Sequence, residues 1–411
     1  MNYEEKIHLC DGSEYNGIKN YKSNVKGLGS FYLIFNNSVN VEYNGFFGIS
    51  HLIEHCMCEK IKEYEEDFKR YGISYNASTG MTNVSFYIKG LDEGIQKFRK
   101  LFYDIIVNYD IEEDVFNREK NIVIQEYNDS LSSPHHTFIE NVFRKYFYTT
   151  CPGGELKDLK NLSYKEFIKF KNCYFAYPTF ICNTSSSKIK YKDHNFITIK
   201  RSYNLIDNTE HAFQKGWSLK QVKGTISKTS SIVGYFNKFK YDIKDPRKFL
   251  YYIVLSEYMG DGLTSPLYKE LREETGHVYS ISCNVDSLYE HGNGSLNIII
   301  NVGNEYVKEI KEKLLNCINF HFNNLNKEKF ENTIIGIKND IKKAKYLKYS
   351  FCNSFIEKVL TLIENFNFDF DEFKFLALQL IKDKKNYILI DDKHIWGCNL
   401  WKIMKNLKKK D

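Results

Sequence analysis

Apolar residues recur along the chain in two spacings, which predict alternating strands and helices. Alternating or continuous apolar positions, typical of β-strands, occupy residues 29–35 and 82–88. From residue 91 to about residue 140 they recur at every third or fourth position, as on one face of a helix. Turn and capping residues mark further elements in this half: strands at residues 7–10, 72–80 and 179–182, and helices at residues 65–71 and 163–174.

The second half of the chain restarts a similar order of elements. A strand is followed by a helix, two strands and another helix, at residues 231–236, 249–258, 281–285, 296–302 and 305–315. This order suggests a weak internal duplication. We therefore expect an α+β fold with two related domains, each a mostly antiparallel sheet with helices packed on one face. Residues 1–190 would form the first domain, residues 191–225 a polar linker and residues 226–411 the second domain.

Composition and charge exclude some classes of protein. No apolar run approaches the 18 residues that a membrane-spanning helix needs. The start shows no basic region followed by an apolar one, so no signal peptide is expected and a cytoplasmic location is predicted. The net charge of +6 is spread along the chain, except for a basic run at residues 402–410 that we interpret as a solvated tail. Neither nucleic acid nor a membrane is an expected partner.

Candidate chemistry is concentrated in residues 48–55, which contain the pattern H-x-x-E-H. On a helix, His51 and His55 stand one above the other and could offer two imidazole nitrogens to one metal ion. Glu54 shares that face, and its carboxylate could take a proton from a water at the metal. A chain with 11 His and 52 acidic residues gives roughly 0.04 chance matches to this pattern. The pattern therefore favours a metal site without proving one.

A third metal ligand has candidates downstream. Residues 117–128 are predicted to be helical, with Ile122, Val123 and Ile124 as their apolar filling. Glu119 and Glu126 lie seven residues apart, about two helical turns, so both side chains point the same way. One of them could bind the metal and the other could hold a metal-binding histidine by its second ring nitrogen. Taken without the histidine motif, they would be two surface acids.

Cysteines offer a different set of possible ligands. Ten are scattered along the chain without a C-x-x-C pair, and we expect them to be reduced. Cys56 and Cys58 closely follow His55, but Cys56 would point about 100° away from it on a helix. We interpret both as small apolar fillers of the core. His135 and His136 follow a predicted turn and are expected to be exposed.

With H-x-x-E-H followed by two glutamates seven apart, the chain resembles the pitrilysin or insulinase-type zinc metallopeptidases, a family of inverzincins. Glu126 lies 71 residues after His55, a separation that fits the family. The resemblance implies that His51, His55 and Glu126 are the ligands of one Zn²⁺ ion per chain. It also implies that Glu54 is the general base and that Glu119 is a supporting acid.

Two further segments are similar to the family. Residues 72–80 contain Gly72, then Asn76, Ala77 and Thr79, in the place of a family strand that lies at a sheet edge facing the metal and binds the substrate peptide. Without the resemblance they would be an ordinary hairpin. Residues 260–279 match a pattern whose Arg and Tyr reach the metal site from the second domain, here Arg272 and Tyr279. A guanidinium and a phenol suit the oxyanion formed from a substrate carbonyl.

The resemblance implies a zinc-dependent endopeptidase that hydrolyses unstructured peptides inside a closed chamber. Longer family members join four domains in one chain, so two domains here imply closure by a partner. Because zinc residues and the Arg–Tyr pair occur in one chain, we expect a homodimer, with a heterodimer with a related subunit as the alternative. Other open interpretations are a non-catalytic or partner-dependent subunit and a maturation peptidase dedicated to one peptide product.

Overall fold

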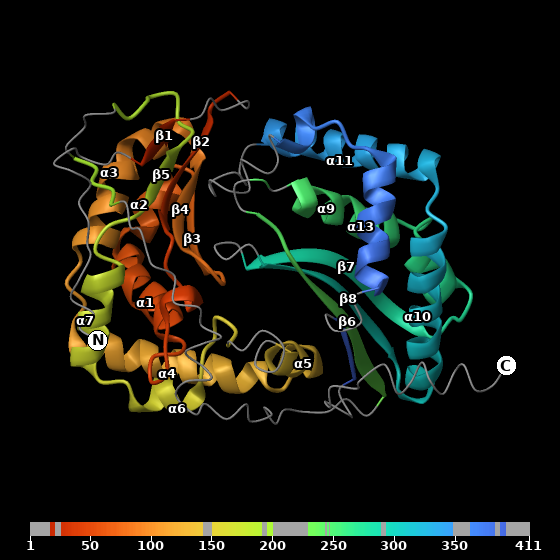
Figure 1. Ribbon diagram of the computed structural model, residues 1–411. Coiled ribbons are helices and arrows are strands. Elements are labelled where there is room, and N and C mark those ends of the chain that lie inside the picture. Colours follow the sequence, from red (N-terminus) through yellow and green to blue (C-terminus); the bar gives the residue numbers. More distant parts are fainter. Residues whose placement is uncertain are drawn as a thin grey trace. The chain divides into compact units, whose positions relative to one another are not determined.

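The chain folds as two compact units in a computed structural model (Figure 1). The first unit is built mainly from the N-terminal half, and the second from the C-terminal half together with Ser130–Asn141. The structure describes ten segments: residues 17–20, 26–142, 150–190, 195–199, 229–242, 245, 247–288, 293–347, 362–382 and 387–391. The strand predicted at residues 7–10 and the basic run at 402–410 lie outside these residues, as does most of the predicted linker.

The first unit contains a five-stranded sheet with strand order β1-β5-β2-β4-β3. Its strands are β1 (Ile18–Asn20), β2 (Leu28–Phe35), β3 (Ile73–Thr79), β4 (Val84–Leu91) and β5 (Phe180–Asn183). Strand β2 pairs antiparallel with β4 and with β5, and β4 pairs antiparallel with β3. Strand β1 pairs parallel with β5. The strands predicted at residues 29–35, 72–80, 82–88 and 179–182 are confirmed.

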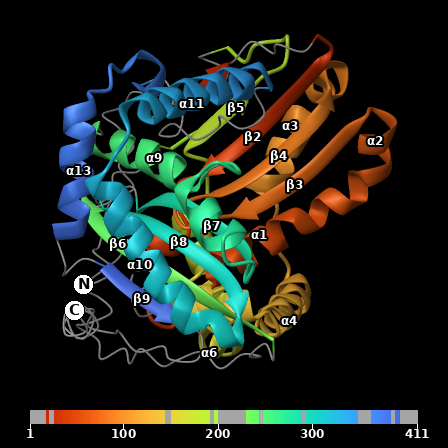
Figure 2. The same cartoon turned by 90° about the vertical axis from the view of Figure 1, so that its right-hand side faces the viewer.

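Helices cover one face of this sheet, with α1 and α3 against it (Figures 1 and 2). The helical segments of the unit are η1 (Val39–Val41), α1 (Ile49–Cys58), η2 (Glu59–Tyr64), α2 (Glu65–Arg70), α3 (Asp92–Asn108), α4 (Glu113–Ser130), α6 (Leu156–Asn161) and α7 (Tyr164–Tyr174). The predicted N-cap of α7 is confirmed, because Ser163 and Glu166 form a capping box. Alternate β2 residues, Phe31, Leu33 and Phe35, are fully buried beneath these helices.

The second unit contains a four-stranded sheet with strand order β7-β8-β6-β9, and all its pairs are antiparallel. Its strands are β6 (Ser230–Lys240), β7 (Val278–Leu288), β8 (Asn293–Gly303) and β9 (Tyr387–Asp391). Its helical segments are α5 (Pro134–Val142), α9 (Arg247–Gly260), η4 (Tyr268–Glu273), η6 (Asn304–Tyr306), α10 (Val307–Asn323), α11 (Lys327–Leu347) and α13 (Phe370–Lys382). Helices α9 and α10 pack against the sheet (Figure 2).

The two sheets repeat one topology. The order β5-β2-β4-β3 in the first corresponds to β9-β6-β8-β7 in the second. In each unit a long strand leads into a helix, α1 or α9, and a hairpin of two strands follows. The predicted α+β fold of two related domains is therefore confirmed, whereas the predicted domain limits stay predictions. By this correspondence, α9 occupies in the second unit the position that the histidine helix α1 occupies in the first.

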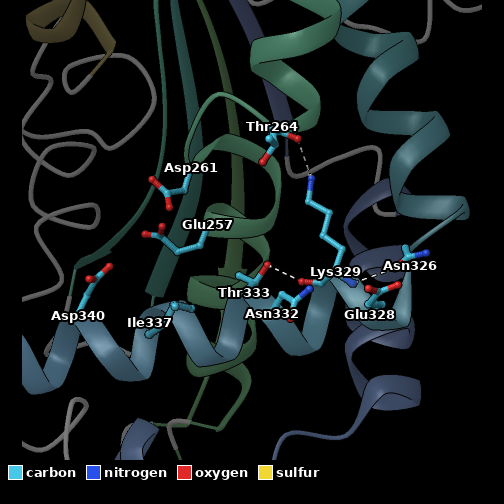
Figure 3. Close-up of a pocket in the computed structure, with 11 residues that line it drawn as sticks. Glu257, Asp261, Thr264, Asn326, Glu328, Lys329, Asn332, Thr333, Ile337 and Asp340 are labelled. Carbon is cyan, nitrogen blue, oxygen red and sulfur yellow. Dashed lines mark hydrogen bonds between the residues drawn. The ribbon is translucent and has the colours of Figure 1, made fainter.

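Helices α9 and α11 enclose a polar pocket of about 440 Å³ in the second unit (Figure 3). Carboxylates of Glu257, Asp261 and Asp340 line one side, and Lys329 extends from α11 to the carbonyl oxygen of Thr264. The pocket contains none of the residues that the sequence predicts for the active site. Among the described residues, no helix is both long enough and apolar enough to cross a membrane.

Candidate metal centre

Helix α1 presents its two faces as the sequence predicts. Ile49, Leu52 and Ile53 are fully buried in the core of the first unit. His51 and His55 project from the other side, with their ring centroids 4.8 Å apart. The spacing of apolar residues thus orients the helix, and the orientation brings both imidazoles to one place.

Two carboxylates hold the chain where α1 begins. The N–H groups of Gly48 and Ser50 donate to Glu42, each over 2.9 Å. Those of Gly45 and Phe47 donate to Asp158, over 2.8 and 3.2 Å. Burial raises the pKa of Glu42 to about 7, although the two backbone N–H groups favour its charged form.

Gly48 itself has a left-handed backbone, with φ of 95°, and lies directly against another glycine. A Cβ atom added to Gly154 would stand 2.2 Å from the Cα atom of Gly48. The segment of residues 151–154 therefore packs on the start of the histidine helix, and only glycine fits at the contact.

Glu126 on α4 faces both histidines. Its Oε2 atom lies 3.4 Å from Nε2 of His55 and 3.8 Å from Nε2 of His51. The three ligating atoms all lie within 4.8 Å of one another. Ligand atoms about 2.0–2.1 Å from a tetrahedral zinc ion stand roughly 3.3–3.4 Å apart, close to these separations. The arrangement fits a zinc ion bound through two imidazoles and a carboxylate.

Glu119, two helical turns before Glu126, holds the far side of one imidazole. Its Oε2 atom lies 3.3 Å from Nδ1 of His55, and its side chain is 4% exposed. A proton on Nδ1 would be donated to this carboxylate, which leaves Nε2 free as the metal-binding nitrogen. Arg118 contacts Glu119 at 3.3 Å and Glu59 at 2.6 Å, so the supporting carboxylate is itself paired.

His51 is poised as a neutral ligand. Burial, with a smaller contribution from His55, lowers its pKa to about 4. Its Nδ1 atom is buried without a hydrogen-bond partner among the described residues. A neutral imidazole with Nε2 directed at Glu126 has the lone pair that a metal ligand requires.

Glu54 lies beside the ligands but is held by a different element. The hydroxyl of Thr79, at the end of β3, donates a hydrogen bond to Glu54 Oε2. Burial raises the pKa of the Glu54 carboxyl above its ordinary value. A carboxylate in this position can accept a proton from a water next to the imidazoles.

The two predicted substrate-binding residues lie on an edge strand. Among the described residues, β3 pairs only with β4, and it contains Asn76 and Ala77. Asn76 is exposed, and its side-chain oxygen accepts from the N–H of Ala77 over 2.9 Å. An edge strand offers unpaired backbone groups to an extended peptide.

Arg272 and Tyr279 belong to the second unit and occupy irregular backbone there. Arg272 is on η4, a π-helix, and its guanidinium lies over the Tyr268 ring at 5.2 Å. Tyr279 falls where the register of β7 shifts between Val278 and Ser280, and it is 65% exposed. Such bulges and π-turns are frequent at functional sites, because they redirect a side chain. The approach of both residues to the metal centre stays a prediction.

Some sequence predictions need correction and some residues were missed. Ile122 is 40% exposed on α4, so it does not fill the core as expected, whereas Val123 does. Cys56 is fully buried, as expected of a filler. Glu42 and Asp158 were not predicted to support the site, and no local pattern marks them. Thr79 fits the family pattern of residues 72–80, but its hydrogen bond to Glu54 was not predicted.

Two models of one peptidase family match the chain, one in each half. Residues 41–155 match the model of insulinase, peptidase family M16, and residues 207–336 match the peptidase M16 inactive domain. The first match contains all ligand candidates of the metal centre. The second contains Arg272 and Tyr279.

Relatives with similar sequences are named as zinc proteases. The zinc protease PqqE of Helicobacter pylori is 26% identical over 144 residues, which cover 33% of this chain and 32% of that protein. An uncharacterized zinc protease of Rickettsia bellii is 22% identical over 268 residues, 61% of this chain and 63% of the relative. The matches therefore span less than two thirds of these relatives.

A solved structure shows the same fold over nearly the whole chain. The crystal structure of a protease from Helicobacter pylori matches 92% of this chain and 97% of its own, with a TM-score of 0.72. The sequence identity is 17%, so this likeness concerns the fold.

Proposed function

Because the chain belongs to the insulinase and pitrilysin family of peptidases, M16, we propose that it is a zinc-dependent endopeptidase. The observation that carries this proposal is the convergence of His51, His55 and Glu126, with Glu54 beside them. The substrate class would be unstructured peptides.

His51, His55 and Glu126 would hold the zinc ion. Zinc bound there would polarise the scissile carbonyl and lower the pKa of a water molecule. Glu54 would accept the proton of that water and deliver it to the leaving amine. Thr79 would fix the Glu54 carboxylate through its hydrogen bond, and Glu119 would fix the His55 ring.

The edge strand β3 would align the substrate. A peptide that adds to β3 must be extended, because its main chain has to pair with that of Asn76 and Ala77. Thr79 of the same strand bonds Glu54, so the strand connects peptide alignment with the general base. Folded proteins, whose backbone groups are already paired, would be poor substrates.

The second unit would contribute Arg272 and Tyr279 to stabilise the oxyanion. A homodimer would close the chamber, since one chain contains both sets of residues. The family model over residues 207–336 is described as an inactive domain, which agrees with a second half that lacks the histidine motif. A subunit that needs a different, related partner for activity is the competing proposal.

The purified chain, its His51→Ala variant and a fluorogenic unstructured peptide test the proposal. We expect the wild type alone to bind zinc and cleave the peptide. Cleavage should stop when a chelator is added. His51→Ala should lose the zinc ion of this centre and the cleavage activity. Zinc binding without cleavage until a second gene product is added would support the partner-dependent subunit instead. Equal zinc content and activity in both proteins would refute the assigned centre.

A further inference from the structure

A second group of metal-binding side chains lies in the second unit, away from the histidine motif. Glu270, Cys317 and His321 each offer one ligand atom, and these atoms lie within 4.8 Å of one another. Among the described residues, only this group and that of His51, His55 and Glu126 meet that criterion. We propose that Glu270, Cys317 and His321 form a second zinc site, which ties η4 to α10.

The backbone brings the three ligands together from two elements. Cys317 and His321 are four residues apart on α10, so both side chains leave the same face of that helix. Glu270 comes from η4, which packs against α10. His321 Nε2 and Glu270 Oε1 are in hydrogen-bond contact, and the Cys317 thiol also interacts with Glu270. The three ligand atoms are therefore already close enough to share one ion without a change in the backbone.

The group is buried on one side and exposed to solvent on the other. Leu271, Leu314 and Ile318, neighbours of the ligands on the same elements, are buried in the core of the second unit. Cys317 is 1% exposed, whereas the side chains of His321 and Glu270 are 19% and 32% exposed. Three fixed protein ligands with one side towards solvent leave a fourth position for water.

The donor set selects the metal. A thiolate and an imidazole together favour zinc over magnesium or calcium, which prefer oxygen ligands. Zinc accepts Cys, His and Glu in tetrahedral sites. An ion bound through Glu270 would also stabilise η4, the π-helix on which Arg272 lies. Only the consequence for the role of Arg272 rests on the proposed peptidase function.

Metal content and a spectrum test the proposal without reference to activity. We expect two zinc ions per wild-type chain, and one each in His51→Ala and in Cys317→Ser. With Co²⁺ in place of zinc, the second site should give a thiolate-to-cobalt charge-transfer band. The first site has no thiolate, so the band should survive His51→Ala and disappear in Cys317→Ser. Cys58→Ser, which alters a partly buried thiol three residues after His55, should keep the band.

Glu270→Gln provides a test on a partly exposed position, in case Cys317→Ser fails to fold. We expect this variant to bind the second zinc at least tenfold more weakly, while its circular dichroism stays that of the wild type. Glu273→Gln, an exposed position on the same π-helix, is the matched control and should bind normally.

Three outcomes would overturn the second site. The first is a wild type with a single zinc that His51→Ala abolishes. The second is a cobalt protein without the thiolate band. The third is a band lost in Cys58→Ser but kept in Cys317→Ser. Loss of peptidase activity with two zinc ions retained would instead count against the proposed function and leave this site intact.

Discussion

The Nδ1 atom of His55 lies 3.3 Å from the Oε2 atom of Glu119, on the side of the ring away from Glu126. A histidine whose second nitrogen is held by a carboxylate is fixed in its tautomer and is a more basic ligand. We therefore expect Glu119→Ala to weaken zinc binding by about 10–100-fold. Competition with a chelator measures this, and Glu113→Ala, exposed on the same helix, should bind as the wild type does.

Glu54 should separate proton transfer from metal binding. Because Glu54 is assigned as the base and not as a ligand, Glu54→Gln should keep its zinc. Its kcat should fall by several orders of magnitude, towards the upper end of the about 100- to 10,000-fold that a positioned general base usually contributes. Measuring the zinc content and the rate of peptide hydrolysis of this variant tests the assignment. A variant that has lost its metal would show that Glu54 is a ligand.

Tyr279→Phe tests whether the second unit completes the active site. We expect lower turnover with unchanged zinc content, because one hydrogen bond to the oxyanion contributes about 3–4 kcal/mol. The loss should be smaller than that of Glu54→Gln. Wild-type turnover by this variant would remove Tyr279 from the mechanism.

The buried carboxyl of Glu42 should make the stability of the first unit depend on pH. Its pKa in the folded chain is raised to about 7 from 4.5, so the folded state holds a proton that the unfolded state has released. The free energy of unfolding should therefore fall by up to about 3 kcal/mol as the pH rises from about 4.5 to about 7.

Urea unfolding across this pH range measures the effect. Glu42→Gln cannot ionise and should show a shallower decline. Glu66→Gln, whose native side chain is 91% exposed, is the matched control and should decline as the wild type does. Parallel curves for wild type and Glu42→Gln would exclude Glu42 as the source.

Gly154 and Gly27 provide a matched pair for the contact at the start of α1. Both have left-handed backbones, with φ of 76° and 84°, but only an added Cβ at Gly154 meets other atoms closely. Gly27→Ala should cost about 1 kcal/mol for the backbone alone. Gly154→Ala should cost about 1–3 kcal/mol more. Equal unfolding midpoints for the two variants would show that the contact yields without strain.

The histidine helix and the glutamate pair could be predicted because their information is local. His51 and His55 share a face by helical spacing, and so do Glu119 and Glu126. Ile122 shows the limit of such reasoning. In the run Ile122–Ile124, successive side chains turn by about 100°, so three consecutive apolar residues cannot all face one core.

Other features depend on contacts between distant residues. Asp158 caps backbone groups more than 100 residues earlier in the sequence. Thr79 reaches Glu54 only because β3 packs beside α1. The bulge at Tyr279 arises from the pairing of β7 with β8, and no residue type in β7 predicts it. Such long-range arrangements cannot be predicted from local sequence patterns.

The open edge of β3 has a consequence for the solubility of the chain. A strand with unpaired backbone groups can add a strand from another molecule as readily as a substrate, which is how sheets aggregate. The residues of β3 that face outward are small and polar: Ser74, Asn76 and Ser78 are all exposed. These side chains cannot form the dry apolar interface between sheets that makes such pairing persist. In the proposed peptidase, an edge of this composition would bind one peptide after another and still release each of them.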